Sequence, residues 1–590
     1  MAVAPEAAPQ VAPTTPPDAL DESGAQKEAG GAVDHAHADS DSDEPIHSEA
    51  QAGVRNIEAI TTVWTKTALI TAYAMIWVIY FIETMQSGTT SSLSPYVTSS
   101  FQAHSLTPTV GIFSSIIGGV FKLTLAKILD VFGRPQGYAL SVCLLTLGLV
   151  MMAACNTVET YAAAQVFYWI GYNGLDYSLS IFIADTSHLK NRGLMFAFAS
   201  SPYIITTWLG GRIAESFLKG PGFRWGFGVF CIVMPVVTMP LFGLFTYYFY
   251  KARNMGLVPK HETNRTFMQS SLYYAREFDV IGLFLLSAGI SLFLLPFNIY
   301  SYQKEEWRAP IIICFLVFGF LLIVGFAVWE KFFTPVKFLP YHLFLDRTFM
   351  GACILAGSVF VSFYCWDGYF GSFLQVVNGL SITEASYVAN IYTIGSCLWS
   401  IVVGLFIRKT GNFKWICLGF GVPFTILGVG LMLKFRQPDV NIGYIVMCQI
   451  FIAFAGGTIV ICEQTAAMAA VSHQYVAVVI AIEGMFAKIG GGIGSSIAAA
   501  IWQGMFPKAL AKYLPAEEQG NLTLIYEDLT VQLSYPVGSE ARHAIQQAYA
   551  DAQRMMLIAG TAVLAVSFFA VAFWRDINVK ERKQVKGRVV

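Results

Sequence analysis

The stretch Leu125-Ala-Lys-Ile-Leu-Asp130-Val-Phe-Gly133-Arg134-Pro135 decides how the rest of the chain is organised. It lies between two apolar runs that are each long enough to cross a bilayer, so we interpret it as a very short turn at a membrane face. Asp130 can cap the end of a helix, Gly133 permits a tight reversal, and Arg134 can bind a carboxylate or helix carbonyls in the neighbouring bundle. These three residues are the first candidates for a gating motif.

A fainter copy of this turn, Gly404-Leu-Phe-Ile-Arg408-Lys409-Thr-Gly411, follows a later apolar run and adds Arg408 to the motif residues. One such turn in each half is what an internally repeated transporter would show. The composition agrees, because 55% of the 590 residues are apolar and only 13% are charged. A soluble domain of this composition would be insoluble, so the sequence predicts an all-α polytopic membrane protein.

Windows of roughly 20 apolar residues, the length that spans a bilayer, predict fourteen transmembrane helices. They lie near residues 64–86, 107–127, 136–156, 160–185, 193–214, 225–250, 279–299, 309–330, 348–370, 384–407, 414–434, 443–467, 476–501 and 555–574. An even number puts both termini on one side. Lys and Arg are concentrated in the loops on that side and in the tail after Trp574, so we expect both termini in the cytosol.

This pattern divides the chain into six parts. We expect a disordered acidic cytosolic tail (1–60), an N-terminal six-helix bundle (61–250), a basic cytosolic linker (251–278), two additional helices with a loop (279–347), a C-terminal six-helix bundle (348–574) and a basic cytosolic tail (575–590). The C-terminal bundle includes a long extracellular loop, 502–554, whose alternating Tyr, Leu, Ile and Val argue for packing rather than disorder. Asn521-Leu-Thr523 in this loop is a glycosylation sequon.

Charged residues within membrane helices are costly and usually mark a transport pathway. The candidates are Glu83, Lys122, Asp176, Asp367, Glu463, Glu483 and Lys488. The two lysines could neutralise carboxylates on neighbouring helices, for instance Lys488 with Glu463 or Glu483. A structural pair and a role in transport are equally good interpretations of these lysines.

Several aromatic residues are spaced so that they share a helix face with a carboxylate or with one another. A lone aromatic in a membrane helix is about three times more often a lipid contact or an interfacial anchor than a binding residue. Aromatics stacked over a carboxylate deep in a helix, such as Trp169 and Tyr172 with Asp176, favour a binding role. The candidate substrate-binding residues are Tyr80, Trp169, Tyr172, Trp366, Tyr369, Phe373, Tyr392 and Trp399.

The sequence gives little support for a disulfide, a metal site, ATP binding or enzymatic catalysis. The ten cysteines lie within or at the ends of apolar runs and form neither a CxxC pair nor a Cys/His metal spacing, so we expect no disulfide and no metal site. There is no Walker-type sequence for ATP, no Ser-His-Asp pattern and no HExxH motif. The run Gly490 to Gly494 indicates close helix packing. These observations favour a carrier driven by an ion gradient over an enzyme, with no cofactor.

Several segments carry a family resemblance. The Leu125–Pro135 turn resembles the signature of the major facilitator superfamily, with Ala126 where that signature has Gly. The segments Glu83–Phe101, Ile181-Phe-Ile-Ala-Asp185, Gln532-Leu-Ser-Tyr535-Pro and Gln547-Ala-Tyr549-Ala together resemble the fungal siderophore-iron transporters, particularly the filamentous-fungal Mir type. The resemblance runs from about Trp64 to the last helix and includes the long final external loop.

The resemblance implies a proton-driven importer of ferric hydroxamate siderophores, such as triacetylfusarinine C or ferrichrome, in the plasma membrane or in endosomal vesicles. It implies roles in uptake for Tyr535 and Tyr549 of the last external loop. Iron travels inside the siderophore, so the carrier needs no metal ligands of its own. Coupling needs a buried carboxylate that binds a proton at the acidic face. Asp176 is the first candidate, followed by Glu83 and Glu463.

Two alternatives remain open at this stage. A fourteen-helix drug–proton antiporter has the same fold and the opposite direction of transport, and the long last loop argues against it. A nutrient sensor that binds ligand without moving it would carry a large cytosolic domain, whereas the N-terminal tail here is short and acidic.

Overall fold

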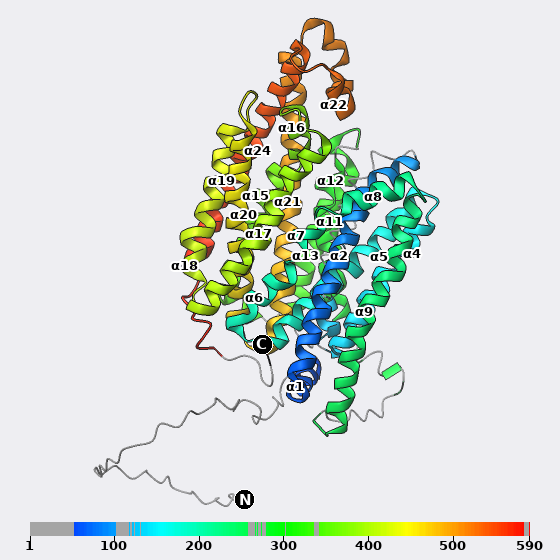
Figure 1. Cartoon of the computed structure of the whole chain (residues 1–590), viewed down its shortest axis with the longest axis vertical. Coiled ribbons are helices and arrows are strands. Elements are labelled where there is room, and N and C mark those ends of the chain that lie inside the picture. The colour runs from blue at the N-terminus through cyan, green and yellow to red at the C-terminus, as the bar shows by residue number, and fades with distance from the viewer. Residues whose placement is uncertain are drawn as a thin grey trace, which may run out of the picture. The chain divides into compact units, whose positions relative to one another are not determined.

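The computed structural model describes residues 52–101, 121–122, 124–129, 131–257, 279–300, 303–334 and 341–582, together with a few isolated positions. Every regular element in these ranges is a helix (Figure 1). Asp130 and most of the predicted span 107–127 lie outside the described residues.

The helices before the basic linker form one consecutive group. They are α1 (Ala52–Val63), α2 (Lys66–Ser100), α4 (Arg134–Ala154), α5 (Val158–Thr186), α6 (Leu189–Ser200), α7 (Tyr203–Thr206), α8 (Gly210–Lys219) and α9 (Phe223–Asn254). A pair then follows, α11 (Val280–Leu294), extended by α12 (Pro296–Ile299), and α13 (Pro310–Phe332).

The remaining helices form a second group. They are α14 (Tyr341–Leu345), α15 (Arg347–Asp367), α16 (Phe370–Val376), α17 (Ile382–Thr410), α18 (Lys414–Ile416), a π-helical turn (Cys417–Gly421), α19 (Val422–Phe435), α20 (Ile442–Ala469), α21 (Val476–Tyr513), α22 (Leu522–Glu527), α23 (Leu529–Ser534) and α24 (Glu540–Ala572). Local signals set many of their ends. Ser381 and Glu384 form a reciprocal capping box at the start of α17, and Gly411 ends that helix with φ 81°.

Ten helices of the described part are long and apolar enough to cross a membrane. The predicted span 160–185 is the long helix α5, which is not among these ten, and the predicted span 279–299 is interrupted at Pro296. The predicted span 193–214 is wrong as a single helix, because the chain forms the three short helices α6, α7 and α8 there. Pro202 and the pair Gly210-Gly211 explain the breaks, since proline lacks a backbone donor and glycine weakens a helix.

Three predicted boundaries need correction. The tail does not extend to residue 60, because α1 starts at Ala52 and buries Ile57 and Ile60. Helix α2 continues to Ser100, so Glu83 lies near its middle and not at its outer end. The loop 502–554 is shorter than predicted, because α21 continues to Tyr513 and α24 begins at Glu540. These extensions are too polar for an apolar window to detect.

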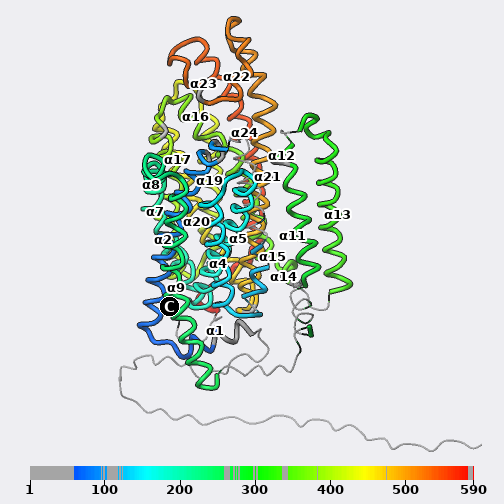
Figure 2. The backbone as a smooth tube through the Cα atoms, turned by 90° about the vertical axis from the view of Figure 1, so that its right-hand side faces the viewer, coloured from blue at the N-terminus to red at the C-terminus, as the bar shows by residue number. Residues whose placement is uncertain are grey.

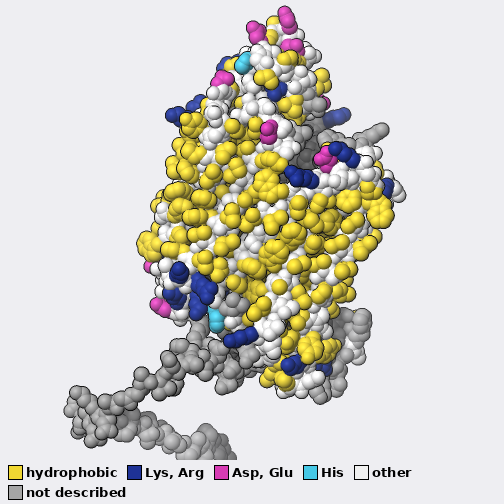
Figure 3. Space-filling view, viewed as in Figure 1, with side chains coloured by type: hydrophobic (Ala, Val, Ile, Leu, Met, Phe, Trp, Pro, Cys, Tyr) yellow, Lys and Arg dark blue, Asp and Glu magenta, His cyan; other side chains and the backbone are white. Residues whose placement is uncertain are grey.

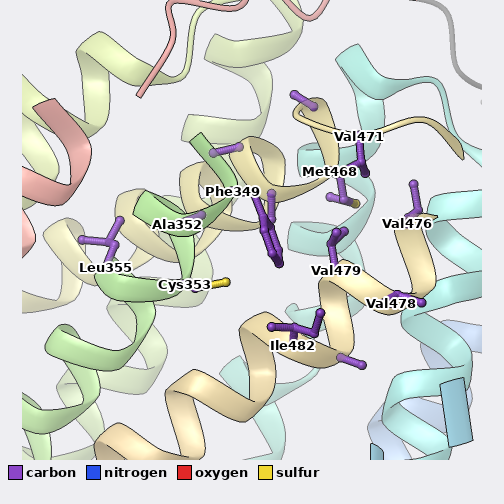
Figure 4. Close-up of a cluster of buried hydrophobic side chains, with 14 of the residues drawn as sticks. Phe349, Ala352, Cys353, Leu355, Met468, Val471, Val476, Val478, Val479 and Ile482 are labelled. Atoms are coloured by element: carbon purple, nitrogen blue, oxygen red, sulfur yellow. The ribbon is translucent and has the colours of Figure 1, made fainter. Parts of the chain in front are cut away.

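The buried residues form three large clusters. One contains only residues of α1 to α9, such as Leu145 and Phe182, and a second contains only residues of the second group, such as Ile545 and Leu557. The third joins Leu129 and Ile181 of the first group to α15, α17, α20 and α21. Figure 4 shows part of this shared core around Phe349, Cys353, Val479 and Ile482.

The helices α11 and α13 lie at the edge of the molecule, with α11 next to α21 and α13 on the far side of α11 (Figure 2). Asp279 ties the pair together: it accepts hydrogen bonds from Gly282 N of α11, Trp329 Nε1 of α13 (2.7 Å) and Thr334 Oγ1 (3.2 Å). The outer side of α13 exposes Phe318, Phe320 and Leu321. Figure 3 shows the wider pattern, an apolar band with Lys, Arg, Asp and Glu gathered above and below it, which is the surface of a multi-pass membrane protein.

Candidate functional site

The first cluster of the candidate site joins three helical segments through Asp176 of α5. Lys122 Nζ, from the helical residues before the Arg134 turn, lies 3.3 Å from Asp176 Oδ2, and Tyr80 of α2 donates to Asp176 Oδ1 at 3.3 Å. The Asp176 side chain remains 40% exposed, whereas that of Lys122 is 15% exposed. The carboxylate therefore has a positive partner and also faces open space.

Glu83 lies close to this ion pair but has a different environment. It is 1% exposed, and no described residue offers a hydrogen bond to either carboxyl oxygen. Asp176 and Lys122 both act on it electrostatically. A charged, unpaired carboxylate inside a membrane protein is very costly, so this environment favours a protonated Glu83.

Aromatic residues form the wall beside these carboxyl groups. Trp169 and Tyr172 of α5 meet edge to face with their ring centroids 5.5 Å apart, which confirms the shared face predicted from their spacing. The Tyr172 hydroxyl shares a hydrogen bond of 3.3 Å with that of Tyr203 on α7. Sequence reasoning missed Tyr203, because its contact with α5 depends on the break between α6 and α7.

The candidate aromatics of the second group divide into two sets. Trp366 and Phe373 are buried in its core, at 1% and 0% exposure, and Trp366 lines a small cavity of about 20 Å³ with Tyr392. The other three are half-buried: Tyr369 is stacked on Trp502 at 4.2 Å and Trp399 on Phe454 at 4.6 Å, whereas Tyr392 is tilted against Phe363 at 5.1 Å, all measured between ring centroids. Tyr369, Tyr392 and Trp399 are therefore the better placed to contact a ligand in this conformation.

A second acidic site lies between α20 and α21. Glu463 and Glu483 are 3% and 6% exposed, and their carboxyl groups interact with each other. Among the described residues no ion pair joins either of them to Lys488, so the pairing suggested as one possibility does not form, whereas Lys122 does pair with a carboxylate of another helix, Asp176. Lys488 instead acts electrostatically on Lys122 and Asp176. Asp367, at the end of α15, lies within electrostatic range of the buried Arg436.

The Arg134 end of the molecule holds the two helix groups together. Arg134 Nε donates to Asp185 Oδ2 at 2.9 Å, and His473 Nε2, just before α21, lies 3.5 Å from Asp185 Oδ1. The prediction that Arg134 binds a carboxylate is confirmed. Tyr177 adds a bond across the groups by donating to Ala477 O at 2.5 Å. Sequence analysis identified neither Asp185 nor His473 as a partner, since both come from distant segments.

The remaining motif residues differ in their surroundings. Gly133 adopts φ 112°, a conformation that favours glycine and gives the turn before α4. Arg408 of the second turn is exposed and forms no ion pair with the described residues. Close contact there comes instead from Gly404, because a Cβ atom on it would stand 2.7 Å from Leu194 Cα of α6.

The opposite end, here called the α22 end, is a compact set of short helices (Figure 1). Tyr535 is half-buried and donates to Glu518 Oε2 at 2.7 Å, and Asn521 Nδ2 donates to the same oxygen at 2.9 Å. These two hydrogen bonds hold the pKa of Glu518 below its usual range. Asn521 of the predicted sequon is exposed.

Tyr549 has a structural place at this end. It is 1% exposed, its ring contacts Trp502 and Phe506, and its hydroxyl donates to Gln532 Oε1 of α23 at 2.8 Å. Gln532 in turn donates to Ile525 O at 2.7 Å. Tyr549 therefore positions the short helices and does not offer its ring to a ligand.

Tyr549→Phe is expected to lower the free energy of unfolding by about 1 kcal/mol, because it removes one buried hydrogen bond and keeps the ring contacts. Thermal unfolding of the purified protein measures this loss. Tyr444→Phe is the matched control, since the exposed Tyr444 hydroxyl has no hydrogen-bond partner among the described residues. Equal melting temperatures for the two variants would contradict the assignment.

This chain is similar to known proteins over most of its length. A family model described as Major Facilitator Superfamily matches residues 76–495. The "MFS siderochrome iron transporter 1" of Ajellomyces capsulatus is 61% identical over 579 residues, which cover 98% of each chain. The "Siderophore iron transporter mirB" of Emericella nidulans is 41% identical over 98% of this chain and 96% of its own.

Among solved structures, the human organic anion transporter MFSD10 aligns with a TM-score of 0.50 at 9% identity, over 86% of this chain and 99% of that chain, which shows the fold alone. The two transporter relatives, in contrast, match nearly the whole length of the chain. The chain therefore belongs to the fungal siderochrome iron transporters of the major facilitator superfamily, a family of multi-pass membrane transporters and not of enzymes.

Proposed function

We propose that this protein imports ferric hydroxamate siderophores across the plasma membrane, driven by protons, through alternating access. The observation that carries the proposal is the 61% identity, over 98% of both chains, with a protein described as a siderochrome iron transporter. A relative at 41% identity is likewise described as a siderophore iron transporter. The proposed ligand is of the triacetylfusarinine C or ferrichrome type.

The proposed topology has fourteen crossings: two six-helix bundles, with the α11–α13 pair as the extra two. The Arg134 end faces the cytosol and the α22 end faces outward. The excess of Lys and Arg in the loops at the Arg134 end supports this orientation. In this orientation Asn521 is available for glycosylation. The ion pairs that close the Arg134 end, together with the exposed face of Asp176, support an outward-facing state.

The proposed ligand site lies between the two groups. On the first group it uses Tyr80, Trp169 and Tyr172, and on the second group Tyr369, Tyr392 and Trp399. A ferric siderophore already surrounds its iron with oxygen ligands, so aromatic walls with a few polar groups suffice to hold it. The described residues contain no cluster of three or more His, Cys, Asp and Glu that could hold a metal ion.

Glu83 replaces Asp176 as the first candidate for proton coupling. Asp176 has a lysine 3.3 Å away, which stabilises its charged form, whereas Glu83 is buried without a partner among the described residues. A group that gains and loses a proton during transport must be stable when neutral. Asp176 and Lys122 then form a charged pair that interacts electrostatically with Glu83, so its energy depends on whether Glu83 is protonated. The buried pair Glu463 and Glu483 is a second candidate in the other group.

Uptake of radioiron by yeast cells lacking their own siderophore carriers tests the function. Cells expressing the protein should accumulate iron supplied as a ferric trihydroxamate, but not iron supplied as ferric citrate, and a protonophore should stop the accumulation. Cells carrying an empty vector are the control. If the protein is at the surface and preloaded cells lose the complex faster than control cells, the protein is an exporter and the proposal fails.

A further inference from the structure

We propose that Lys122 and Lys488, one from each helix group, form a cationic binding site between the two groups that selects ferric complexes by charge. The site takes complexes that are neutral or negatively charged and present an oxygen-rich face, and it discriminates against positively charged complexes. This inference rests on the proposed function and specifies the ligand class of the same site.

Helix α21 places Lys488 beside the ion pair of the first group. Gly484 and Lys488 are four residues apart, so they lie on one face of α21. That face is turned toward Lys122, because a Cβ atom built on Gly484 would stand 4.0 Å from Lys122 Cδ. The side chain of Lys122 thus lies between Asp176 of α5 and the Gly484–Lys488 face of α21.

The charges of this cluster do not balance. Lys122 is paired with Asp176 at 3.3 Å, but Lys488 forms no ion pair or hydrogen bond with any described residue. Lys488 is half-buried on the face of α21 that is turned toward Lys122. Of the other acidic groups in electrostatic reach of Lys122, Glu83 and Glu483 are almost fully buried. Asp176 is the one exposed carboxylate among these groups. While Glu83 and Glu483 are protonated, the cluster therefore carries one positive charge in excess.

An unpaired ammonium group inside a membrane protein is costly until a ligand compensates it. Carboxylates and electron-rich oxygens form charge-assisted hydrogen bonds with lysine. The hydroxamate and carbonyl oxygens of a ferric siderophore supply such acceptors over its surface. A ligand held by both lysines also touches both helix groups at once, which links its binding to the relative movement of the groups.

The test uses one linear ferric trihydroxamate in three forms: with a free ammonium group, with that amine acetylated, and with it succinylated. The complexes have nearly the same size and differ by one unit of charge at each step. Radioiron uptake by cells expressing the wild-type protein should favour the anionic and neutral forms over the cationic form. Lys488→Gln should weaken the apparent affinity for the anionic form about tenfold, and change that for the cationic form much less.

Lys508→Gln is the matched control, because Lys508 is an exposed lysine of the same helix. Lys488→Arg keeps the charge and must keep the wild-type order of the three complexes, which allows the test even if the Gln variant fails to reach the surface. The inference is overturned if Lys488→Gln reaches the cell surface and keeps the wild-type order of preference among the three complexes. It is also overturned if Lys488→Arg reaches the cell surface and loses that order. Uptake of none of the complexes by the wild-type protein would overturn the proposed function as well.

Discussion

Glu83→Gln is expected to abolish uphill accumulation of the ferric siderophore while leaving its binding and its exchange across the membrane close to the wild-type level. Glutamine keeps the size of the side chain but cannot release a proton. The buried carboxyl group of Glu83 has no hydrogen-bond partner among the described residues that the exchange would break. Without coupling, the carrier only equilibrates its ligand, and the ratio of inside to outside concentration falls to about one.

Radioiron accumulation and exchange, measured in the same membrane vesicles, separate the two effects. Glu215→Gln is a suitable control, since Glu215 is exposed and its one ion pair among the described residues is with Lys219 of its own helix. Asp176→Asn should behave differently from Glu83→Gln, because it leaves Lys122 without its partner and should weaken ligand exchange as well. Normal accumulation by Glu83→Gln would remove Glu83 from the coupling mechanism.

Gly490→Ala is expected to destabilise the folded protein by about 1–3 kcal/mol or more, because helices α15 and α21 cross at this glycine without space for a methyl group. A Cβ atom on Gly490 would stand 2.2 Å from the carbonyl oxygen of Gly357, and one on Gly494 would stand 2.4 Å from that of Val361. Both clashes involve backbone atoms, so a rotamer change cannot relieve them. Gly490→Val should destabilise the folded protein more than Gly490→Ala.

The yield of folded protein and its melting temperature measure this effect. Gly504→Ala, on the same helix, is the matched control, because a Cβ atom there meets no atom within 4 Å. It should be neutral or slightly stabilising, since alanine favours a helix over glycine. A Gly490→Ala variant as stable as Gly504→Ala would show that the two helices do not approach as closely as described.

The helical fold could be predicted from the sequence because apolar length is a direct physical requirement of the bilayer. Two features could not. The break at Pro202 lies inside an otherwise apolar window, and the extensions of α2, α21 and α24 lie outside the apolar windows that predict spans. An apolar window records the part of a helix in contact with lipid and misses helix that continues into water or packs on another segment.

The candidate site, like the fold, could be predicted from the sequence only in part. The spacing of Trp169, Tyr172 and Asp176 predicted their shared face, because helix periodicity is local. The partners of Asp176 and Arg134, and the surroundings of Lys488, depend on which distant helices lie next to them, and a single sequence does not contain that information. For this reason Tyr203, Asp185 and His473 were missed, and Lys488 does not pair with Glu463 or Glu483 as was suggested.

We propose that a proton gradient drives the ferric siderophore inward. Purified protein in liposomes that are alkaline inside, supplied externally with a radioactive ferric trihydroxamate, tests it most directly. We predict that the complex accumulates inside only while the gradient persists, and that a protonophore releases it. Accumulation that is the same with and without the gradient would contradict the account.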